Sequence, residues 1–273
     1  MITFVYWQLN LLTVLLFPNA KINIGLNVLY KRQDGYHELE TIFYPVPLCD
    51  ALEISPAQSP KFSSSGISIP AGKNLCQKAY DLLAQDFNLT PVHIHLHKNI
   101  PIGAGLGGGS ADAAFTLLGL DKMFELGLSN KQLKQYALQL GADCPFFIDN
   151  KACLATGIGE ELTPIDLDLS DYKLVLVKPN VSVSTAQAYA GVKPSNQGTA
   201  LKDLIAQPMP EWSLKNDFES SVFSAHPELQ EIKQELIRKG AVYTSMSGSG
   251  STIYAFFKEV PKINFKKASV FTF

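Results

Sequence analysis

The chemistry of this chain is most evident in residues 101–110, where Pro-Ile-Gly-Ala-Gly-Leu-Gly-Gly-Gly-Ser places five glycines within seven positions. Glycine adopts positive φ and lets the backbone approach a ligand closely, because it has no Cβ. A helical pattern follows, and a helix N-terminus offers unpaired N–H groups and a partial positive charge. The loop therefore predicts an anion site with polyphosphate as its natural ligand. The alternative is a sharp, flexible turn, for which fewer glycines would suffice.

Three common phosphate loops do not fit this stretch. Gly103 and Gly108 have the Walker spacing, but Gly109 stands where that pattern requires lysine. The dinucleotide pattern also matches, yet the acidic residue expected about 20 positions later, at the end of a second strand, is missing. A protein-kinase loop would be followed by a strand that carries lysine, whereas a helical pattern follows here. A less common phosphate loop remains.

Lys21 and Asp143 have the charges that phosphoryl transfer needs. The reaction requires alignment of donor and acceptor, neutralisation of charge on the transferred group, and a group that receives the proton of the acceptor alcohol. Apolar and polar residues alternate over 20–26, which predicts a strand with Lys21 and Asn23 on one face. Asp143 follows a helix that ends in glycine, so it is either an ordinary turn residue or a catalytic base.

Helical and strand patterns alternate along the chain and must position these groups, which predicts an α+β or α/β protein. Capping and periodicity predict that Gly141 ends its helix in a left-handed conformation. The predicted helices cover residues 74–87, 111–124, 129–141 and 227–240, and the predicted strands cover residues 92–97, 172–177, 241–246 and 252–257.

Composition excludes several classes of protein. The chain has 273 residues, 46% of them apolar, and a formal net charge of −2, which excludes a disordered chain and gives no support for a nucleic-acid partner. The first 17 residues carry no charge, but they lack the basic start of a secretory signal and are too short and interrupted to span a membrane. They are predicted to form one or two buried strands, with no membrane partner.

The cysteines and histidines do not indicate a metal site. The four cysteines show no short paired spacing, which favours reduced, mostly buried thiols in a cytoplasmic protein over disulfides or structural zinc. Three histidines alternate along one predicted strand face, where a metal site and a solvated face are both possible, and the solvated face is favoured. These residues are Cys49, Cys76, Cys144, Cys153, His93, His95 and His97.

Three stretches together resemble the motifs of the GHMP kinases, which include galactokinase and the homoserine, mevalonate and phosphomevalonate kinases. Residues 18–25 resemble the first motif, residues 101–114 the second and residues 248–250 the third. Residues 20–23, 34–38 and 140–145 are similar to one branch of the family, which phosphorylates a cytidine diphosphate-linked polyol in non-mevalonate isoprenoid synthesis. The similarity extends from Pro18 to Phe257.

The resemblance implies an α+β fold of two lobes, with ATP and the polyol between them. The N-terminal ATP-binding lobe would cover residues 1–155 and a ferredoxin-like C-terminal lobe residues 156–273. Mg²⁺ is expected with ATP, but its ligands are not predicted, because Gly108 and Gly109 replace hydroxyl residues that some relatives carry. Another GHMP small-molecule kinase and a catalytically silent nucleotide-binding homologue remain alternatives, and the oligomeric state is not predicted.

The same resemblance assigns roles to individual residues. Lys21 would stabilise the acceptor oxygen and the γ-phosphate, and Asp143 would accept or orient the proton of the hydroxyl. Asn23 would contact the polyol. Tyr36 and Tyr189 would stack on the cytosine base and His37 would hydrogen-bond its edge. The residues implied in ATP binding are Pro101, Gly103, Ala104, Gly105, Leu106, Gly107, Gly108, Gly109, Ser110 and Ala111.

Overall fold

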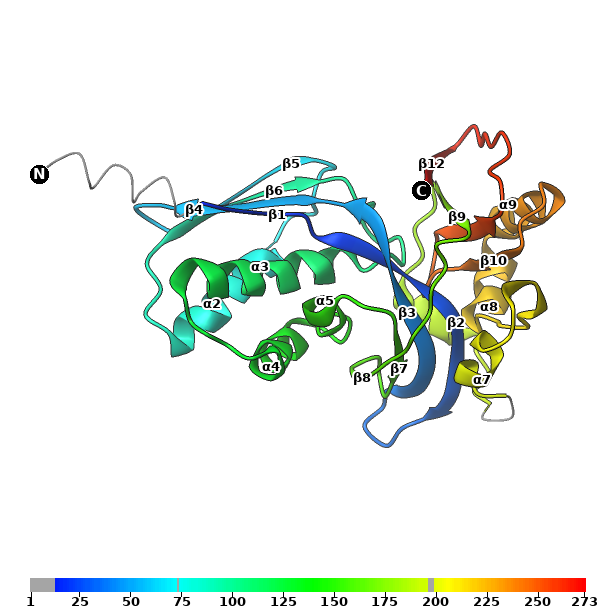
Figure 1. Ribbon diagram of the computed structural model, residues 1–273, viewed down its shortest axis with the longest axis horizontal. Helices are drawn as coiled ribbons and strands as arrows, with labels where there is room; N and C mark the ends of the chain where they lie inside the picture. Colours follow the sequence, from blue (N-terminus) through cyan, green and yellow to red (C-terminus); the bar gives the residue numbers. More distant parts are fainter. Residues whose placement is uncertain (1–12, 73, 196–198) are drawn as a thin grey trace, which may run out of the picture. The chain divides into compact units, whose positions relative to one another are not determined.

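The computed structural model describes residues 13–72, 74–195 and 199–273, which form two compact units that interleave along the chain (Figure 1). The first unit comprises the described residues before Lys21 together with Leu48–Ile102 and Gly108–Asn150. The second unit comprises Lys21–Pro47, Gly103–Gly107 and Lys151–Phe273. The expected lobe boundary between residues 155 and 156 is a single cut, and it stays a prediction.

A four-stranded sheet with the order β1-β4-β6-β5 forms one layer of the first unit. Its strands are β1 (Val14–Leu16), β4 (Ala51–Pro56), β5 (Lys61–Gly66) and β6 (Val92–Lys98). Strand β4 runs antiparallel to β1 and β6, whereas β5 runs parallel to β6. In the register, Leu52 lies opposite Leu96 and Ile54 opposite Ile94, and all four side chains are buried. One face of the sheet is therefore apolar.

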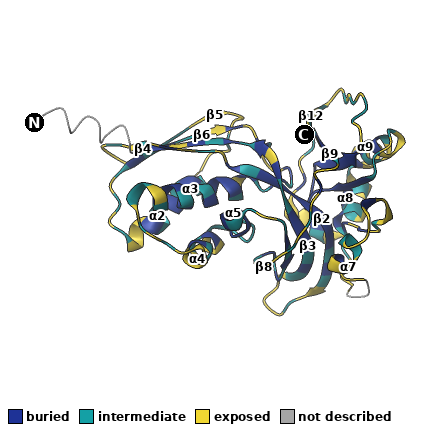
Figure 2. Cartoon of the chain, in the orientation of Figure 1, coloured by how far each residue is buried: buried dark blue, intermediate teal, exposed yellow. Residues whose placement is uncertain are grey.

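Helix α3 (Gly108–Phe124) lies along this apolar face, as Figure 1 shows. A Cβ at Gly119 would lie 2.7 Å from Ile54 Cδ1 and 2.9 Å from Leu16 Cδ1, so the missing side chain lets the helix approach the sheet closely. Figure 2 shows buried residues along most of α3, in contrast to the largely exposed α4 (Asn130–Leu140). The layer is completed by α2 (Leu75–Asp86) and α5 (Phe146–Asp149).

The predicted helix starts at Asn74 and Ser129 are confirmed, because each residue forms a capping box with the glutamine three positions later. The predicted left-handed stop at Gly141 is wrong. Gly141 has φ 165° and ψ 154°, which is extended backbone, and its N–H still donates to Ala137 O at 3.2 Å. The chain leaves the helix as an extended segment, which leads directly into the turn that holds Asp143.

The apolar start of the chain is less buried than the sequence predicts. Residues 1–12 lie outside the described residues. In β1, Val14 is buried, but Leu15 is 57% exposed and Phe17, just after the strand, is 56% exposed, because β1 is an edge strand with one face open. No helix in the described part of the chain combines the length and apolar character that crossing a bilayer requires.

The three histidines of β6 hydrogen-bond to serines of the parallel neighbour β5. Ser63 Oγ lies 2.7 Å from His93 Nε2 and 2.8 Å from His95 Nδ1. Ser65 Oγ lies 3.0 Å from His95 Nε2 and 2.9 Å from His97 Nδ1. His97 is exposed and the other two imidazoles are half-buried, so these rings and hydroxyls form the polar face of the sheet.

Three of the four cysteines are buried, and Cys49 is partly exposed. Burial raises the pKa of Cys76 far above its ordinary value, and it raises the pKa of Cys144 to about 12. The prediction that the thiols are mostly buried is therefore confirmed, and Cys76 and Cys144 are poor nucleophiles.

Two sheets form the second unit, with the orders β2-β3-β7-β8 and β10-β11-β9-β12. The first sheet comprises β2 (Asn19–Lys31), β3 (His37–Cys49), β7 (Cys153–Thr156) and β8 (Glu161–Pro164). The second comprises β9 (Lys173–Pro179), β10 (Tyr243–Met246), β11 (Ile253–Phe257) and β12 (Ala268–Thr272), and all its neighbouring strands are antiparallel. The helical segments are α6 (Thr185–Ala190), α7 (Leu201–Ile205), η1 (Met209–Glu211), α8 (Phe218–Ala225) and α9 (Pro227–Arg238).

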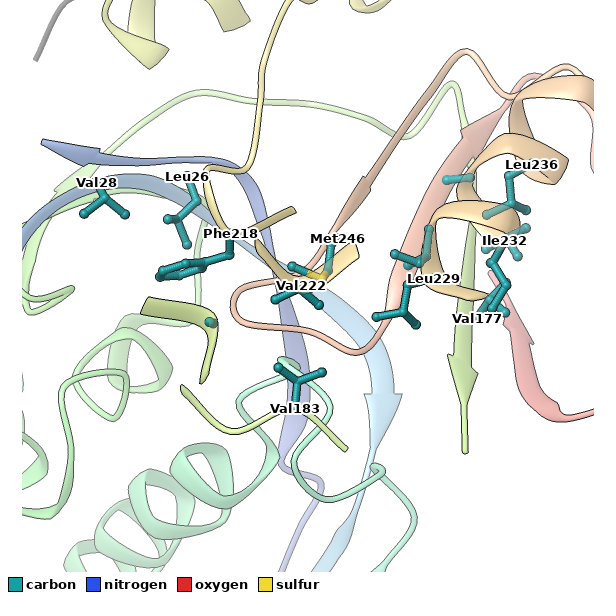
Figure 3. Packing of buried hydrophobic residues seen from close by; sticks show 14 of the residues in the cluster. Leu26, Val28, Val177, Val183, Phe218, Val222, Leu229, Ile232, Leu236 and Met246 are labelled. Atoms are coloured by element: carbon teal, nitrogen blue, oxygen red, sulfur yellow. The ribbon is translucent and has the colours of Figure 1, made fainter. Parts of the chain in front are cut away.

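The core of the second unit is the apolar cluster in Figure 3, which joins the sheet β10-β11-β9-β12 to α8 and α9. Leu229, Ile232 and Leu236 repeat at helical spacing on α9 and pack with Val177 and Met246 of the strands. The predicted helix that begins at Pro227 is confirmed, and so are the two antiparallel strands before and after the glycine turn at 248–250. The α+β fold class is thus confirmed.

A buried ion cluster ties three segments of the first unit together. Lys98 Nζ, at the end of β6, contacts Asp50 Oδ2 and lies 2.7 Å from Asp112 Oδ2 of α3. The other oxygen of Asp50 accepts hydrogen bonds from the backbone N–H groups of Asn99 and Ile100, at 2.6 and 2.8 Å. The three charged side chains are at most 4% exposed. The cluster therefore fixes the backbone where it enters the glycine loop and again where it leaves it.

Burial raises the pKa of Asp112 to about 8, although the neighbouring charge of Lys98 opposes the shift and that of Asp50 adds to it. The second carboxylate oxygen of Asp112 is buried with no hydrogen-bond partner among the described residues. A carboxyl group in these surroundings holds its proton at neutral pH.

We expect this proton to make stability fall with rising pH. Asp titrates near pH 4 in an unfolded chain, so between about pH 4 and about pH 8 the folded protein keeps a proton that the unfolded chain loses, and stability decreases by about 1.4 kcal/mol per pH unit. The variant Asp112→Asn cannot titrate, so in urea unfolding its free energy of unfolding should rise relative to the natural protein across this window. Asp171→Asn, at a side chain that is 87% exposed, is the control. Parallel curves for Asp112→Asn and the natural protein would contradict the assignment.

Candidate active site

The glycine loop has an alternating backbone conformation over Gly103–Gly107. Gly103, Gly105 and Gly107 have φ of 63°, 75° and 68°, whereas Ala104 and Leu106 between them have negative φ. Alternation of this kind turns successive N–H groups toward one side and forms a nest, which binds anions. Three of the five glycines are therefore required by the left-handed conformation itself.

Three consecutive carbonyl groups hold this segment to the second unit. Ala104 O accepts from Thr252 N at 3.2 Å, Gly105 O from Ser247 Oγ at 2.7 Å, and Leu106 O from Lys21 N at 2.9 Å. In a trans peptide the N–H points opposite to the carbonyl of the preceding residue. The amides of residues 105–107 therefore point away from the groups that hold the loop, as a phosphate-binding nest requires.

Close packing requires glycine at two positions of the loop and does not require it at Gly109. A Cβ at Gly105 would lie 2.0 Å from Ser247 O, and in the first unit a Cβ at Gly108 would lie 2.8 Å from Ile100 Cγ2. A Cβ at Gly109 would meet nothing closer than Leu75 Cδ1 at 3.7 Å, which is ordinary contact. The space in front of Gly109 is therefore not filled by a close neighbour from the protein.

Helix α3 begins at Gly108, three residues before the predicted start at 111. Gly108, Gly109, Ser110 and Ala111 are therefore the first residues of the helix, whose N–H groups have no partner within the helix. The prediction placed these glycines in the loop because glycine has low helix propensity. That propensity matters less in the first turn, where close packing against Ile100 requires residue 108 to lack a side chain.

Asp143 lies in the same unit as this helix start, in the turn before α5. Cys144 connects the two segments: it interacts with the Ser110 side chain, and its raised pKa reflects burial first and the negative charge of Asp143 as a smaller contribution. Asp143 is half-buried. The role of Asp143 as a proton acceptor stays a prediction.

Lys21 and Asn23 point from one face of β2, as the alternating pattern predicts. Lys21 Nζ donates to Asn23 Oδ1 at 2.5 Å and lies 4.6 Å from the centroid of the Phe43 ring. Only 4% of Lys21 is exposed. The amide oxygen and the ring face both attract a cation, so these two contacts orient the ammonium.

The hairpin between β2 and β3 carries the two residues expected to bind the base. Asp34 Oδ1 accepts from the Tyr36 backbone N–H at 3.1 Å, and the Tyr36 side chain is 60% exposed. His37 stacks on Tyr189 of α6, with ring centroids 4.7 Å apart and an angle of 23° between the planes. Tyr189 in turn meets the edge of Phe218 at 4.8 Å. The structure thus brings His37 and Tyr189 together.

The predicted residues divide between the two units. Lys21, Asn23 and Gly103–Gly107 belong to the second unit, and Asp143 with residues 108–111 belongs to the first. That Lys21 and Asp143 act on one substrate stays a prediction. Sequence reasoning missed two polar contacts of the second unit: Thr41, which bonds to Asn23, and Ser247, which bonds to the loop.

No group of three or more His, Cys, Asp or Glu side chains is arranged to hold a metal ion within the described residues. Mg²⁺ keeps several water ligands and is usually bound through one or two carboxylates together with substrate phosphates.

Two family models match the chain. The one described as GHMP kinases N terminal domain matches residues 74–151, which include the glycine loop and Asp143. The one described as GHMP kinases C terminal matches residues 198–268.

Relatives match nearly the whole chain. A 4-diphosphocytidyl-2-C-methyl-D-erythritol kinase from Bacteroides fragilis is 52% identical over 266 residues, which cover 93% of this chain and 97% of that protein. One from Bacteroides thetaiotaomicron is 53% identical over 250 residues, covering 89% and 91%. A crystal structure of 4-(cytidine 5'-diphospho)-2C-methyl-D-erythritol kinase has a TM-score of 0.77 at 33% identity and covers 89% of both chains. Homoserine kinase from Cytophaga hutchinsonii, with a TM-score of 0.67, 14% identity and 93% of both chains covered, shares the fold.

Alanine at Gly105 and at Gly109 should have different effects. Gly105→Ala places a Cβ on Ser247 O at positive φ, so we expect its thermal unfolding midpoint to fall by several degrees. Gly109→Ala should unfold like the natural protein and bind ATP at least about tenfold more weakly, because its methyl group enters space that packing leaves open. Differential scanning fluorimetry and ATP titration measure the two effects. Equal loss of stability in both variants would contradict this division of roles.

Proposed function

Because this chain belongs to the GHMP kinases, and within them to the 4-diphosphocytidyl-2-C-methyl-D-erythritol kinases, we propose that it phosphorylates the 2-hydroxyl of 4-diphosphocytidyl-2-C-methyl-D-erythritol. It is an ATP-dependent small-molecule kinase. The observation that carries the choice of substrate is the identity of 52% over 93% of the chain with a relative of that name. The reaction would supply the non-mevalonate isoprenoid pathway.

The proposed ATP site is the nest of residues 103–107 together with the start of α3. The amides of residues 105–107, which point away from Thr252, Ser247 and Lys21, would donate to the phosphate oxygens. The first turn of α3 would add N–H groups, and Ser110 a hydroxyl. Mg²⁺ would enter with ATP, bound to phosphate oxygens and water, and would help neutralise charge on the transferred group.

Lys21 is the proposed cation at the transferred group. Charge develops on the phosphoryl oxygens during transfer, and a fixed cation stabilises it without reorganising at the moment of reaction. The ammonium of Lys21 is held by Asn23 and faces the ring of Phe43. Asp143 is proposed to receive or orient the proton of the acceptor hydroxyl. No covalent intermediate with the protein is needed, because positioning and electrostatics supply most of the catalysis in phosphoryl transfer.

The cytidine end of the substrate is proposed to bind at the hairpin tip. Tyr36 would provide an exposed aromatic face for the base, and His37 would donate or accept at the base edge. Tyr189, expected from the sequence as a second stacking face, would instead support His37, since its ring already stacks on the imidazole at 4.7 Å. A supported imidazole keeps a fixed orientation, which base recognition by hydrogen bonds requires.

The cytoplasm is the proposed compartment. The four cysteines show no short paired spacing, and three of them are buried, which is compatible with a reducing environment.

A coupled assay of ADP release tests the substrate. We expect turnover with 4-diphosphocytidyl-2-C-methyl-D-erythritol and very little with methylerythritol that lacks the cytidine diphosphate group, or with homoserine or mevalonate. Turnover of homoserine or mevalonate alone would indicate another GHMP kinase. ATP binding without turnover of any alcohol would indicate a silent nucleotide-binding homologue.

Removal of the proposed base should separate chemistry from binding. Asp143→Asn keeps the shape of the side chain and removes its basicity, so we expect kcat to fall about 100-fold or more, with ATP affinity retained in calorimetric titration. Asp149→Asn, which breaks an ion pair with Lys134 in the same unit, is the matched control and should keep its turnover. Full turnover by Asp143→Asn would remove this residue from the mechanism.

The hairpin tip should affect one substrate only. Tyr36→Ala removes the stacking face, and because stacking contributes about 1–3 kcal/mol per base, we expect the KM for the cytidylyl substrate to rise roughly tenfold or more. Tyr36→Phe retains the ring and should stay close to the natural protein. Steady-state kinetics with each substrate varied in turn measures both values. A matching rise in the KM for ATP would argue against this assignment.

A further inference from the structure

Asn23 is the centre of a buried hydrogen-bond network in the second unit. Its side-chain oxygen accepts from Lys21 Nζ at 2.5 Å, and its side-chain nitrogen donates to Thr41 Oγ1 at 3.0 Å. Its backbone N–H donates to Ser247 Oγ at 3.2 Å, and its backbone carbonyl accepts from the hydroxyl of Tyr254 at 2.9 Å. Asn23 is 3% exposed, and Thr41 is 1% exposed. These bonds fix the position of Asn23 from several directions.

The direction of the Thr41 hydroxyl determines which way the Asn23 amide faces. Thr41 Oγ1 lies 2.6 Å from Gly25 O, and a carbonyl oxygen can only accept. The single proton of Thr41 is therefore used on Gly25, so Thr41 can only accept from Asn23. The group of Asn23 that faces Thr41 must then be the NH₂, and the amide oxygen must face Lys21.

The reverse orientation of the amide would place NH₂ donors against an ammonium. Lysine has three donors and no acceptor, so that arrangement would lose the hydrogen bond and set like partial charges together. The carbonyl that accepts from Thr41 belongs to Gly25, which lies on β2 together with Lys21 and Asn23. Gly25 has φ of 68°, a conformation that favours glycine. The order Gly25, Thr41, Asn23, Lys21 is thus a directed chain of hydrogen bonds that ends on the proposed catalytic cation.

We propose that Thr41 is a positioning residue for phosphoryl transfer, which sets the Asn23 amide so that its oxygen holds the Lys21 ammonium in place. This inference rests on the proposed role of Lys21. Thr41 contacts neither substrate in this account and acts only through Asn23. The network also reaches the loop, because Ser247 accepts from Asn23 N and donates to Gly105 O. The cation and the phosphate nest therefore share one rigid support.

Thr41→Val tests the proposal, because valine keeps the shape of the side chain and removes the hydroxyl. We expect kcat to fall about tenfold or more, with the KM for ATP within about twofold, since a hydrogen bond to a charged group is at stake. Thr41→Ser restores the hydroxyl and should restore kcat to within about twofold. If Thr41→Val does not fold, Thr41→Cys, with a weak donor of similar size, gives the same comparison.

Thr244→Val is the matched control. Thr244 is also buried in the second unit, and its Oγ1 donates to the carbonyl of Tyr254 at 2.8 Å, so the variant loses a comparable hydrogen bond away from Lys21. We expect the kcat of Thr244→Val to stay within about twofold of the natural value. We expect its unfolding midpoint to match that of Thr41→Val. Equal kcat in Thr41→Val and Thr244→Val would overturn the proposal.

A double variant distinguishes positioning from general destabilisation. If Thr41 acts through Lys21, Thr41→Val should have no further effect on kcat once Lys21→Ala is present. Losses that multiply in the double variant would overturn the proposal and leave the role of Lys21 intact. Full activity in Lys21→Ala would overturn both. A natural protein that is active only on a different alcohol would overturn the proposed substrate while the Thr41 comparison still holds for that alcohol.

Discussion

A glycine loop can bind a phosphate only if something other than the phosphate fixes its backbone. Here the fixed groups are three consecutive carbonyls, of Ala104, Gly105 and Leu106, which accept hydrogen bonds from the second unit. Because each peptide is planar and trans, holding the carbonyls on one side forces the following amides to the other. The backbone of the proposed anion site is therefore fixed by the protein itself, and glycine at 105 is needed since any Cβ there would collide with Ser247 O.

The two buried lysines illustrate two ways to place an ammonium in a protein interior, where an uncompensated charge is costly. Lys98 contacts the carboxyl groups of Asp50 and Asp112, and although burial favours its neutral form, these two groups raise its pKa above the ordinary value. Asp112 holds its proton at neutral pH, so Asp50 compensates the charge of Lys98, and the cluster joins β6 to α3. Lys21 donates to the amide oxygen of Asn23 and faces the ring of Phe43, and these two contacts orient its ammonium. The first arrangement joins two elements of the first unit, and the second fixes the direction of the proposed catalytic cation.

Local patterns in the sequence predicted the features that local physics decides. Capping boxes at Asn74 and Ser129 and the alternation over 20–26 specify helix starts and a strand face within a few residues. The anchor of the loop was missed, although Lys98 lies on the same strand face as the buried Val92, Ile94 and Leu96, where a charge needs a partner. The network around Asn23 could not be predicted, since Ser247 is 224 positions away and a single threonine in an apolar strand gives no pattern. The contact between His37 and Tyr189 could not be predicted for a similar reason, because only tertiary packing decides which ring meets Tyr189.

The motifs themselves combine residues with different physical purposes. Within the glycine loop, positions 103, 105 and 107 serve backbone conformation and position 108 serves close packing, whereas Gly109 has neither a positive φ nor a close neighbour that requires glycine. The Ala-Lys-Ile-Asn motif divides in the same way: the two apolar side chains are fully buried, Lys21 presents a charge, and Asn23 spends both ends of its amide on Lys21 and Thr41. A residue can therefore belong to an active-site motif because it holds a neighbour in place. Thr41 has a single hydroxyl proton, which it donates to Gly25, so it can only accept from Asn23. This direction supports a role for Thr41 in holding Asn23 in place rather than in contacting a substrate.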